Sequence, residues 1–346
     1  MVGAGSFGTA VAVLLDRGGL RTTLACRTEE QARELASSRE NKPYLQGVPI
    51  PQRVAIRAFG VRDDQPRADL ILLAVPSHGL GEAIEQLTRR GITPRAYVVS
   101  LAKGLVAPDG TPPTVALERA YGAERVGCVG GPAHAREMVE SGAGLVCASH
   151  SAELAHAVAE VFQGAGVVCE ASPDPVGVEL AGCAKNAAAL ASGATEAQGL
   201  NAAGMAAADI FSEVTALARF YGASRQTFIG RAGIGDLVAT ALAPTSRNRS
   251  AGELLAQGVP SSEIPARLGQ AAEALETVPL LARAIERAGV EAPVTSALAR
   301  LIEGSLPLDD WVALVRARQP APARFGGGWL RGLFARRRRR RQARGA

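Results

Sequence analysis

The sequence has few cysteines, few aromatic residues and no long hydrophobic run. Its five cysteines are odd in number and scattered along the chain, and no two of them form a C-x-x-C pair. This pattern argues against a disulfide framework and a zinc site and favours a reducing compartment, so we expect a cytoplasmic protein. No apolar stretch approaches the ~20 residues of a membrane-spanning helix, and no signal peptide opens the chain.

Acidic residues are missing from the C-terminal end. Residues 324–346 hold nine arginines and no Asp or Glu, which leaves the preceding residues with a net charge of −4 although the whole chain carries +5. We therefore expect that this body of the chain does not bind nucleic acid. The four histidines show no ligand spacing backed by acids or thiols, so we expect no metal site.

Small aliphatic residues dominate a chain in which aromatic residues amount to 4%. This composition is typical of helices packed closely over a parallel sheet. Short apolar runs with the character of buried strands alternate with helical segments over the first half, which predicts a doubly wound α/β sheet. These runs lie at residues 21–26, 68–76, 96–101, 125–129, 144–148 and 166–169.

A glycine-rich loop stands at the start of the chain. Gly3, Gly5 and Gly8 form the pattern G-x-G-x-x-G and run directly into an apolar helical pattern at residues 9–15. Glycines at this spacing let the backbone approach a pyrophosphate at the positive end of a helix dipole, as in Rossmann-type folds. Such a loop normally follows a strand, yet only two residues precede it, so we expect the first, central strand to be largely missing. A start site further upstream would restore this strand, and without it we expect poor folding or weak cofactor binding.

The residue placed to meet the adenosine ribose is basic. Residues 21–26 predict the second strand, and Arg27 follows it where an NAD site usually has an acid. An arginine at this point either pairs with the 2′-phosphate of NADPH or is a solvated surface charge. The sequence therefore allows NADPH as well as NADH.

The second half shows only helical periodicity. Residues 176–221 predict one very long helix or two helices in line, and helical patterns continue to about residue 318. We expect a dinucleotide-binding domain over residues 1–172, an all-helical substrate and catalytic domain over 173–318 and a flexible arginine-rich tail over 319–346.

A lysine, an aspartate and a cluster of hydrogen-bond donors stand out in this helical half. Lys185 lies among Ala, Gly and Cys, where loss of water lowers the pKa of an ammonium and makes proton transfer near neutral pH feasible. The alternative is a lysine that extends along a helix surface into solvent. Asp236 ends a glycine-rich segment, where it either caps a helix or holds the lysine by a charged hydrogen bond. The donors Ser246, Arg247 and Asn248 suit a phosphate or the cofactor, or else form a polar loop.

Taken in order, these segments resemble the bacterial-type NAD(P)-dependent glycerol-3-phosphate dehydrogenases. The resemblance extends from Gly3 to about residue 305. The matching segments are residues 3–10, 39–41, 44–47, 74–77, 102–105, 131–137, 185–186, 201–202, 233–237, 246–249 and 269–273.

The resemblance implies reversible reduction of dihydroxyacetone phosphate to sn-glycerol 3-phosphate by NADPH or NADH, which feeds glycerophospholipid synthesis, and it implies a homodimer. Lys185 would be the proton donor and acceptor, and Asp236 and Asn201 would orient it and the substrate. The implied substrate contacts are Lys103, Gly131, Ala133, Lys185, Asp236, Ser246, Arg247 and Asn248. The implied cofactor contacts are Gly3, Gly5, Ser6, Phe7, Gly8, Arg27, Lys103, Ala135, Arg247, Ala271 and Glu273.

Several positions depart from the family pattern. Ala133 and His134 stand where the family usually has Ser, Thr or Asn followed by Phe, so one donor to the substrate is lost. Asp209 stands where an arginine is usual, and Ala274 replaces a glycine. Two alternatives therefore stay open, namely another lysine-using dehydrogenase that acts on a hydroxy acid and a cofactor-binding relative without catalysis.

The C-terminal tail joins apolar to basic residues. Trp329, Leu330, Leu333 and Phe334 precede six arginines at 336–341. Residues 329–344 either lie on an anionic membrane surface, bind RNA, or form a disordered basic tail without a fixed partner.

Overall fold

The computed structural model describes residues 1–59, 67–243 and 246–317. One compact unit spans Met1–Val315, and a second begins at Arg316. The expected tail at residues 319–346 and its membrane-facing segment lie outside the described residues. None of the helices in the described part of the chain is long and apolar enough to cross a membrane.

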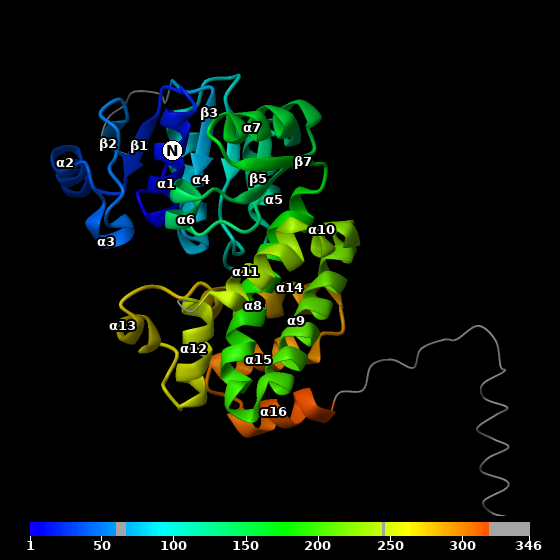
Figure 1. Cartoon of the computed structure of the whole chain (residues 1–346). Helices are drawn as coiled ribbons and strands as arrows, with labels where there is room; N and C mark the ends of the chain where they lie inside the picture. Colours follow the sequence, from blue (N-terminus) through cyan, green and yellow to red (C-terminus); the bar gives the residue numbers. More distant parts are fainter. Residues whose placement is uncertain (60–66, 244–245, 318–346) are drawn as a thin grey trace, which may run out of the picture. The chain divides into compact units, whose positions relative to one another are not determined.

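The first half of the chain forms a β-sheet (Figure 1). Its strands are β1 (Thr23–Cys26), β2 (Ala55–Ala58), β3 (Leu70–Leu73), β4 (Tyr97–Ser100), β5 (Val126–Gly130), β6 (Gly144–Ser149) and β7 (Val168–Ser172). Strand β2 pairs with β1, and the other strands follow one another in the order β3-β4-β5-β6-β7. The sheet confirms the predicted doubly wound α/β class, although β2 was not predicted.

The composition suggested a parallel sheet, but the observed sheet is mixed. Strands β5 and β6 run antiparallel, with Cys128 opposite Ala148, whereas the pairs β1–β2, β3–β4, β4–β5 and β6–β7 are parallel. The connection from β5 to β6 contains only the six-residue helix α6 (Ala135–Glu140). For β6 to run parallel to β5, the chain would first have to cross back along the sheet, which usually takes a longer helix. The short connection instead lets β6 run antiparallel beside β5.

Val2 lies between β1 and β3 and joins them. It forms single parallel bridges to Ala25 of β1 and to Leu73 of β3, and it is 6% exposed. The Val2 N–H donates to the Leu72 carbonyl at 2.8 Å, and the Ala74 N–H donates to the Val2 carbonyl at 2.8 Å. The Ala25 N–H also donates to the Met1 carbonyl at 2.8 Å, and the Gly3 N–H donates to the Ala25 carbonyl at 2.9 Å. Met1, Val2 and Gly3 thus join β1 to β3.

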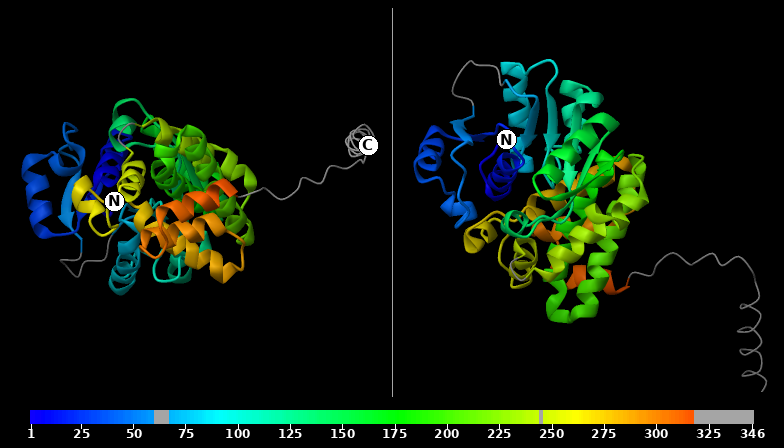
Figure 2. Two further views of the ribbon diagram at one scale, coloured as in Figure 1. Left: turned by 90° about the horizontal axis from the view of Figure 1, so that it is seen from below. Right: turned by 45° about the horizontal axis from the view of Figure 1, so that its top comes forward.

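Helices cover both faces of this sheet (Figure 2). Helices α1 (Ser6–Arg17), α6 and α7 (Ala152–Gly164) share one apolar cluster with Leu72 and Val99. Helices α4 (Ser77–Arg90) and α5 (Pro113–Tyr121) share another with Ile71 and Val98. Successive strand residues point to opposite faces, which is why neighbours such as Ile71 and Leu72 enter different clusters. The remaining helices of this half are α2 (Glu29–Ser38) and α3 (Lys42–Leu45).

The second half is helical, as predicted. Its helices are α8 (Pro175–Thr195), α9 (Leu200–Phe220), α10 (Arg225–Ile229), α11 (Asp236–Leu242), α12 (Arg247–Ala256), α13 (Ile264–Leu268), α14 (Ala274–Ala288), α15 (Pro293–Ile302) and α16 (Leu308–Ala317), with a π-helical turn at Arg231–Gly235. Helix α8 lies at the centre and is buried along almost its whole length.

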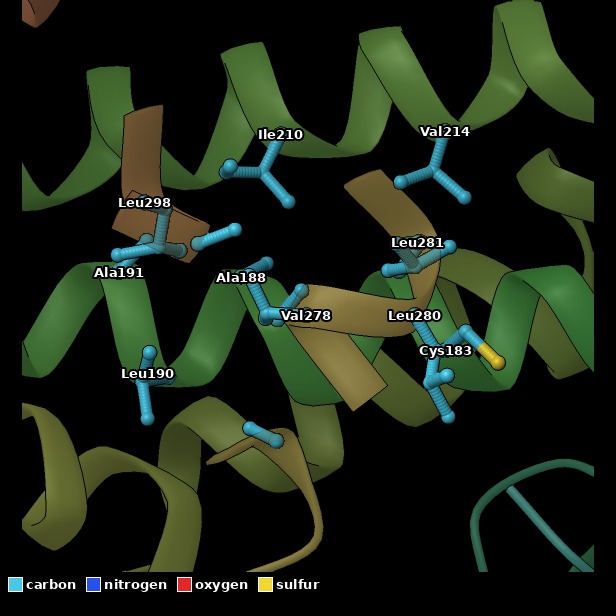
Figure 3. Packing of buried hydrophobic residues seen from close by; sticks show 14 of the residues in the cluster. Cys183, Ala188, Leu190, Ala191, Ile210, Val214, Val278, Leu280, Leu281 and Leu298 are labelled. Carbon is cyan, nitrogen blue, oxygen red and sulfur yellow. The ribbon is translucent and has the colours of Figure 1, made fainter. Parts of the chain in front are cut away.

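The prediction of one long helix or two in line over residues 176–221 is wrong. Helices α8 and α9 pack side by side, and Figure 3 shows Ile210 and Val214 of α9 directed towards the side of α8 that carries Ala188 and Ala191. The chain reverses between them at Gly199, whose φ of +100° only glycine adopts readily. Alanine side chains on α8 are small enough for the two helices to approach closely.

Candidate active site

The glycine loop begins the candidate cofactor site. A side chain on Gly3 would collide with the Ala74 carbonyl, and one on Gly8 would collide with the Gly3 carbonyl, whereas a side chain on Gly5 would meet open space. Helix α1 starts at Ser6, and no side chain caps it. The first N–H groups of a helix have no partner within the helix, so the open space at Gly5 faces donors that suit a pyrophosphate.

A buried asparagine holds this loop. Asn41 is 1% exposed, and its Nδ2 donates to the Ala4 carbonyl at 3.0 Å and to Thr9 Oγ1 at 2.7 Å. The Ser6 hydroxyl donates to the Tyr44 carbonyl at 2.6 Å, which ties the start of α1 to α3. The sequence marked residues 39–41 as a matching segment but assigned Asn41 no role.

The other expected cofactor contacts lie around this loop and in the helical half. Arg27 directly follows β1 and is exposed, and among the described residues its guanidinium takes part in no ion pair. Phe7 and Ala135 are partly buried against the cluster shared by α1 and α6. Ala271 and Glu273 lie on the segment before α14.

Three charged side chains meet where the sheet joins the helical half. Lys103 follows β4, and its Nζ donates to Asp236 Oδ2 at 2.6 Å and to the Gly131 carbonyl, just beyond β5, at 2.8 Å. Lys185 Nζ lies 3.9 Å from Asp236 Oδ1. The side chains of Lys103, Lys185 and Asp236 are 17%, 10% and 4% exposed, so one buried carboxylate faces two largely buried ammonium groups.

Burial controls the protonation of this cluster. It lowers the pKa of Lys185 because the buried ammonium loses water, and the Lys103 charge lowers it further, while Asp236 opposes both effects. Burial alone would raise the pKa of Asp236, but the charges of Lys103 and Lys185 outweigh it and hold that pKa below its usual value. Asp236 is therefore the fixed anion, and Lys185 is the group suited to exchange a proton.

Side-chain amides connect this cluster to three helices. Asn186 Nδ2 donates to the Lys103 carbonyl at 3.0 Å and to Glu273 Oε2 at 3.2 Å. Asn248 Nδ2 donates to Asn186 Oδ1 at 2.8 Å, and the Ala274 N–H donates to Asn248 Oδ1 at 3.1 Å. This network fixes the backbone of Lys103, and Asn186 is a positioning residue that the sequence analysis missed.

The expected phosphate-binding residues are only partly free for a ligand. Ser246 caps α12, because its Oγ accepts the Arg249 N–H at 3.4 Å, and Asn248 is engaged in the amide network. Arg247 is exposed, and its Nη1 donates weakly to Gln270 Oε1 at 3.3 Å and to the Ala271 carbonyl at 3.4 Å. Arg247 thus lies beside the segment that carries the expected cofactor contacts.

Asn201 is not part of the cluster, contrary to the role that the resemblance implied. It is exposed in the first turn of α9. Ser192 lies two turns along α8 from Lys185, and its hydroxyl donates to the carbonyl of Ala203 at 3.4 Å. The start of α9 therefore packs against α8 about two turns away from Lys185. The reversal of the chain between α8 and α9 carries Asn201 away from the lysine.

Asp236 neither caps a helix nor forms a short hydrogen bond with Lys185, the two roles considered from the sequence. Helix α11 starts at Asp236 itself, the preceding Gly235 occupies the N-cap, and no side chain caps the helix. Of the two roles considered, the charged hydrogen bond is present, but its partner at hydrogen-bond distance is Lys103 and not Lys185.

The sequence matches models of one enzyme family over both halves of the chain. Sequence models of the NAD-dependent glycerol-3-phosphate dehydrogenase N-terminus and C-terminus match residues 1–155 and 174–313. The chain belongs to this family. It is 34% identical to the NAD(P)+ glycerol-3-phosphate dehydrogenase of Chlorobium limicola, over 92% of this chain and 97% of that protein. It is 37% identical to the Deinococcus radiodurans enzyme of the same name, over 88% and 90%.

A solved structure shows the same architecture. The glycerol-3-phosphate dehydrogenase gpsA of Coxiella burnetii superposes with a TM-score of 0.84 and 27% identity, over 92% of this chain and 98% of that one. The resemblance inferred from the sequence is therefore confirmed, together with the NAD(P)-binding α/β half followed by a helical half.

Proposed function

We propose that the protein catalyses the reversible reduction of dihydroxyacetone phosphate to sn-glycerol 3-phosphate with NADPH or NADH. Membership of the family supports the substrate and the cofactor. The observation that carries the chemistry is the largely buried Lys185, held near the Asp236 carboxylate by a helix of small residues. A lysine with a lowered pKa can give a proton to a ketone oxygen and later take it back.

The glycine loop fits the cofactor, because Gly5 leaves open space in front of the uncapped start of α1. When bound, the reduced nicotinamide supplies a hydride to the ketone carbon. The backbone at Gly3, Gly5 and Gly8 would hold the pyrophosphate, and Arg27 would meet the ribose side. The further proposed contacts are Ser6, Phe7, Lys103, Ala135, Arg247, Ala271 and Glu273.

The chain's own charged residues would handle the proton. Lys185 Nζ would donate it to the substrate oxygen, and its charge would stabilise the alkoxide as it develops. Asp236 would hold Lys103 directly and raise the pKa of Lys185 through its charge. The remaining proposed substrate contacts are Gly131, Ala133, Ser246, Arg247 and Asn248.

Turnover with defined substrates tests this proposal. The intact protein should oxidise NADPH when dihydroxyacetone phosphate is added, and Lys185→Ala should lower kcat by at least about 10²-fold, as expected for loss of a general acid. NADPH binding, followed by nucleotide fluorescence, should survive in that variant. Turnover only with hydroxy acids or keto acids, or NADPH binding without any turnover, would contradict the proposal and favour one of the two alternatives.

We further propose the boundaries 1–172, 173–318 and 319–346 for the two domains and the tail. The position of the first boundary is supported by β7, which ends at Ser172, and by α8, which begins at Pro175.

We also propose a cytoplasmic homodimer whose residues 329–344 bind anionic membranes. Sedimentation with anionic and neutral vesicles, for the wild type and for a variant with Arg336–Arg341 changed to serine, tests the membrane contact.

A further inference from the structure

His134 lies on the loop that links β5 to α6, beside the charged cluster. Two residues earlier on this loop, Pro132 packs close to Gly235, which directly precedes Asp236. The Gly131 carbonyl accepts the hydrogen bond from Lys103 Nζ at 2.8 Å. The charge of His134 acts on Asp236 in the same direction as the two lysines, which lowers the pKa of that carboxyl. The loop that carries His134 thus lies against the cluster through Gly131 and Pro132.

The ring is held in a way that leaves one nitrogen available. The Met138 N–H donates to the His134 carbonyl at 2.8 Å, so the residue is fixed at the N-cap of α6. Its Nδ1 lies 3.5 Å from Glu137 Oε2, and this is its ion pair among the described residues. The two ring nitrogens lie on different sides of the imidazole, and Nε2 has no hydrogen-bond partner in the part of the chain that the structure describes. The side chain is 48% exposed.

The neighbouring position 133 has no side-chain donor. Ala133 carries no polar group on its side chain, whereas the resemblance places a hydroxyl or amide donor there. Ala133 is partly buried against the apolar cluster of α1 and α6. At positions 133 and 134, the side-chain donor is therefore the imidazole of His134.

We propose that His134 is a substrate-recognition residue, whose imidazole N–H donates to an oxygen of the phosphorylated ketone in place of the donor that position 133 lacks. This inference rests on the proposed function. It assigns His134 an effect on the affinity for the ketone and not on the affinity for the nucleotide, which binds through the glycine loop.

Steady-state kinetics with His134→Phe and His134→Gln test the proposal. Phenylalanine keeps a flat ring but has no N–H, so KM for dihydroxyacetone phosphate should rise about tenfold, as for the loss of one charge-assisted hydrogen bond, while KM for NADPH stays constant. Glutamine keeps a donor and should stay within about threefold of the wild type. Adding Ala133→Ser to His134→Phe should recover most of the lost affinity. His134→Leu removes the donor with a differently shaped side chain and should reproduce the effect of phenylalanine.

The matched control is His156→Phe, an exposed histidine on α7, which should leave both KM values unchanged. If His134→Phe keeps the wild-type KM for the ketone, the ring serves only for packing and the inference is wrong. It is equally wrong if KM for NADPH rises as much as KM for the ketone. If the wild type does not reduce dihydroxyacetone phosphate at all, the proposed function fails first and this inference fails with it.

Discussion

Asp236 Oδ2 lies 2.6 Å from Lys103 Nζ, while its other oxygen lies 3.9 Å from Lys185 Nζ. The carboxylate thus forms its short hydrogen bond with one lysine and acts on the other through its charge. A lysine that kept a short bond to a carboxylate would have its ammonium form stabilised. The longer separation leaves the Lys185 ammonium destabilised by burial, which suits a group that must release a proton.

The two directions of the proposed reaction should respond oppositely to pH. Reduction of the ketone needs Lys185 protonated, and oxidation of the alcohol needs it deprotonated. As pH rises, reduction should slow and oxidation should speed up. Because burial lowers the pKa of Lys185, both changes should occur below the pH range in which an ordinary lysine loses its proton. Profiles of kcat/KM against pH measured in both directions check this expectation. Profiles that bend in the same sense in both directions would contradict the assignment of Lys185.

Asp236→Asn should impair the reaction without removing a proton donor. Loss of the carboxylate leaves two largely buried ammonium groups uncompensated and removes the charge that raises the pKa of Lys185. We expect kcat/KM for reduction to fall by about 10²-fold, the scale of a lost general acid or base contribution. The decline of reduction with rising pH should begin at a lower pH than in the wild type. An unchanged profile would show that Asp236 does not act on Lys185.

Gly5→Val should weaken cofactor binding while leaving the fold intact. A side chain at Gly5 meets open space in the free protein, so the melting temperature without ligand should barely change. The added methyl groups would occupy the space proposed for the pyrophosphate, so Kd for NADPH should rise by at least about tenfold, a loss of 1.4 kcal/mol or more. Gly164→Ala on α7, where the added group also meets open space, is the control and should bind NADPH normally. Equal affinities in both variants would place the pyrophosphate elsewhere.

Glu179 should make the stability of the fold fall as pH rises. This carboxyl is buried on α8, accepts hydrogen bonds from the N–H and the hydroxyl of Thr114, and has its pKa raised by burial to about 8. The folded state therefore holds a proton that the unfolded state loses near pH 4.5. The resulting stabilisation is complete below that pH and disappears as pH rises towards 8. Urea unfolding at pH 6 and pH 8.5 should show this loss in the wild type.

Glu179→Gln is the matched variant for this measurement. Glutamine keeps the shape and can still accept the Thr114 N–H, but it does not titrate. The difference in unfolding free energy between pH 6 and pH 8.5 should therefore be smaller in the variant than in the wild type. An identical difference in both proteins would mean that Glu179 does not carry this pH dependence.

Local patterns in the chain were sufficient to locate the parts that contact one another over short sequence distances. The glycine spacing at residues 3–8 requires a tight turn into a helix. The apolar runs between helices become strands, of which β3, β4, β5 and β6 are largely buried. The small residues around Lys185 indicate a tightly packed helix, in which an ammonium loses its water. These conclusions hold because backbone sterics, side-chain periodicity and solvation act within a few residues.

Tertiary structure decided how these parts face one another. Lys103 and Asp236 are 133 residues apart in sequence, and Asn186 and Glu273 are 87 apart, so no local pattern could pair them. The reversal at Gly199 turned two helices expected in line into a packed pair and moved Asn201 away from the lysine. The sequence by itself determined which residues can bind a dinucleotide or exchange a proton, because these are properties of single groups and short turns. Only the packed fold decided which lysine the carboxylate holds, because this depends on burial and on contacts between distant segments.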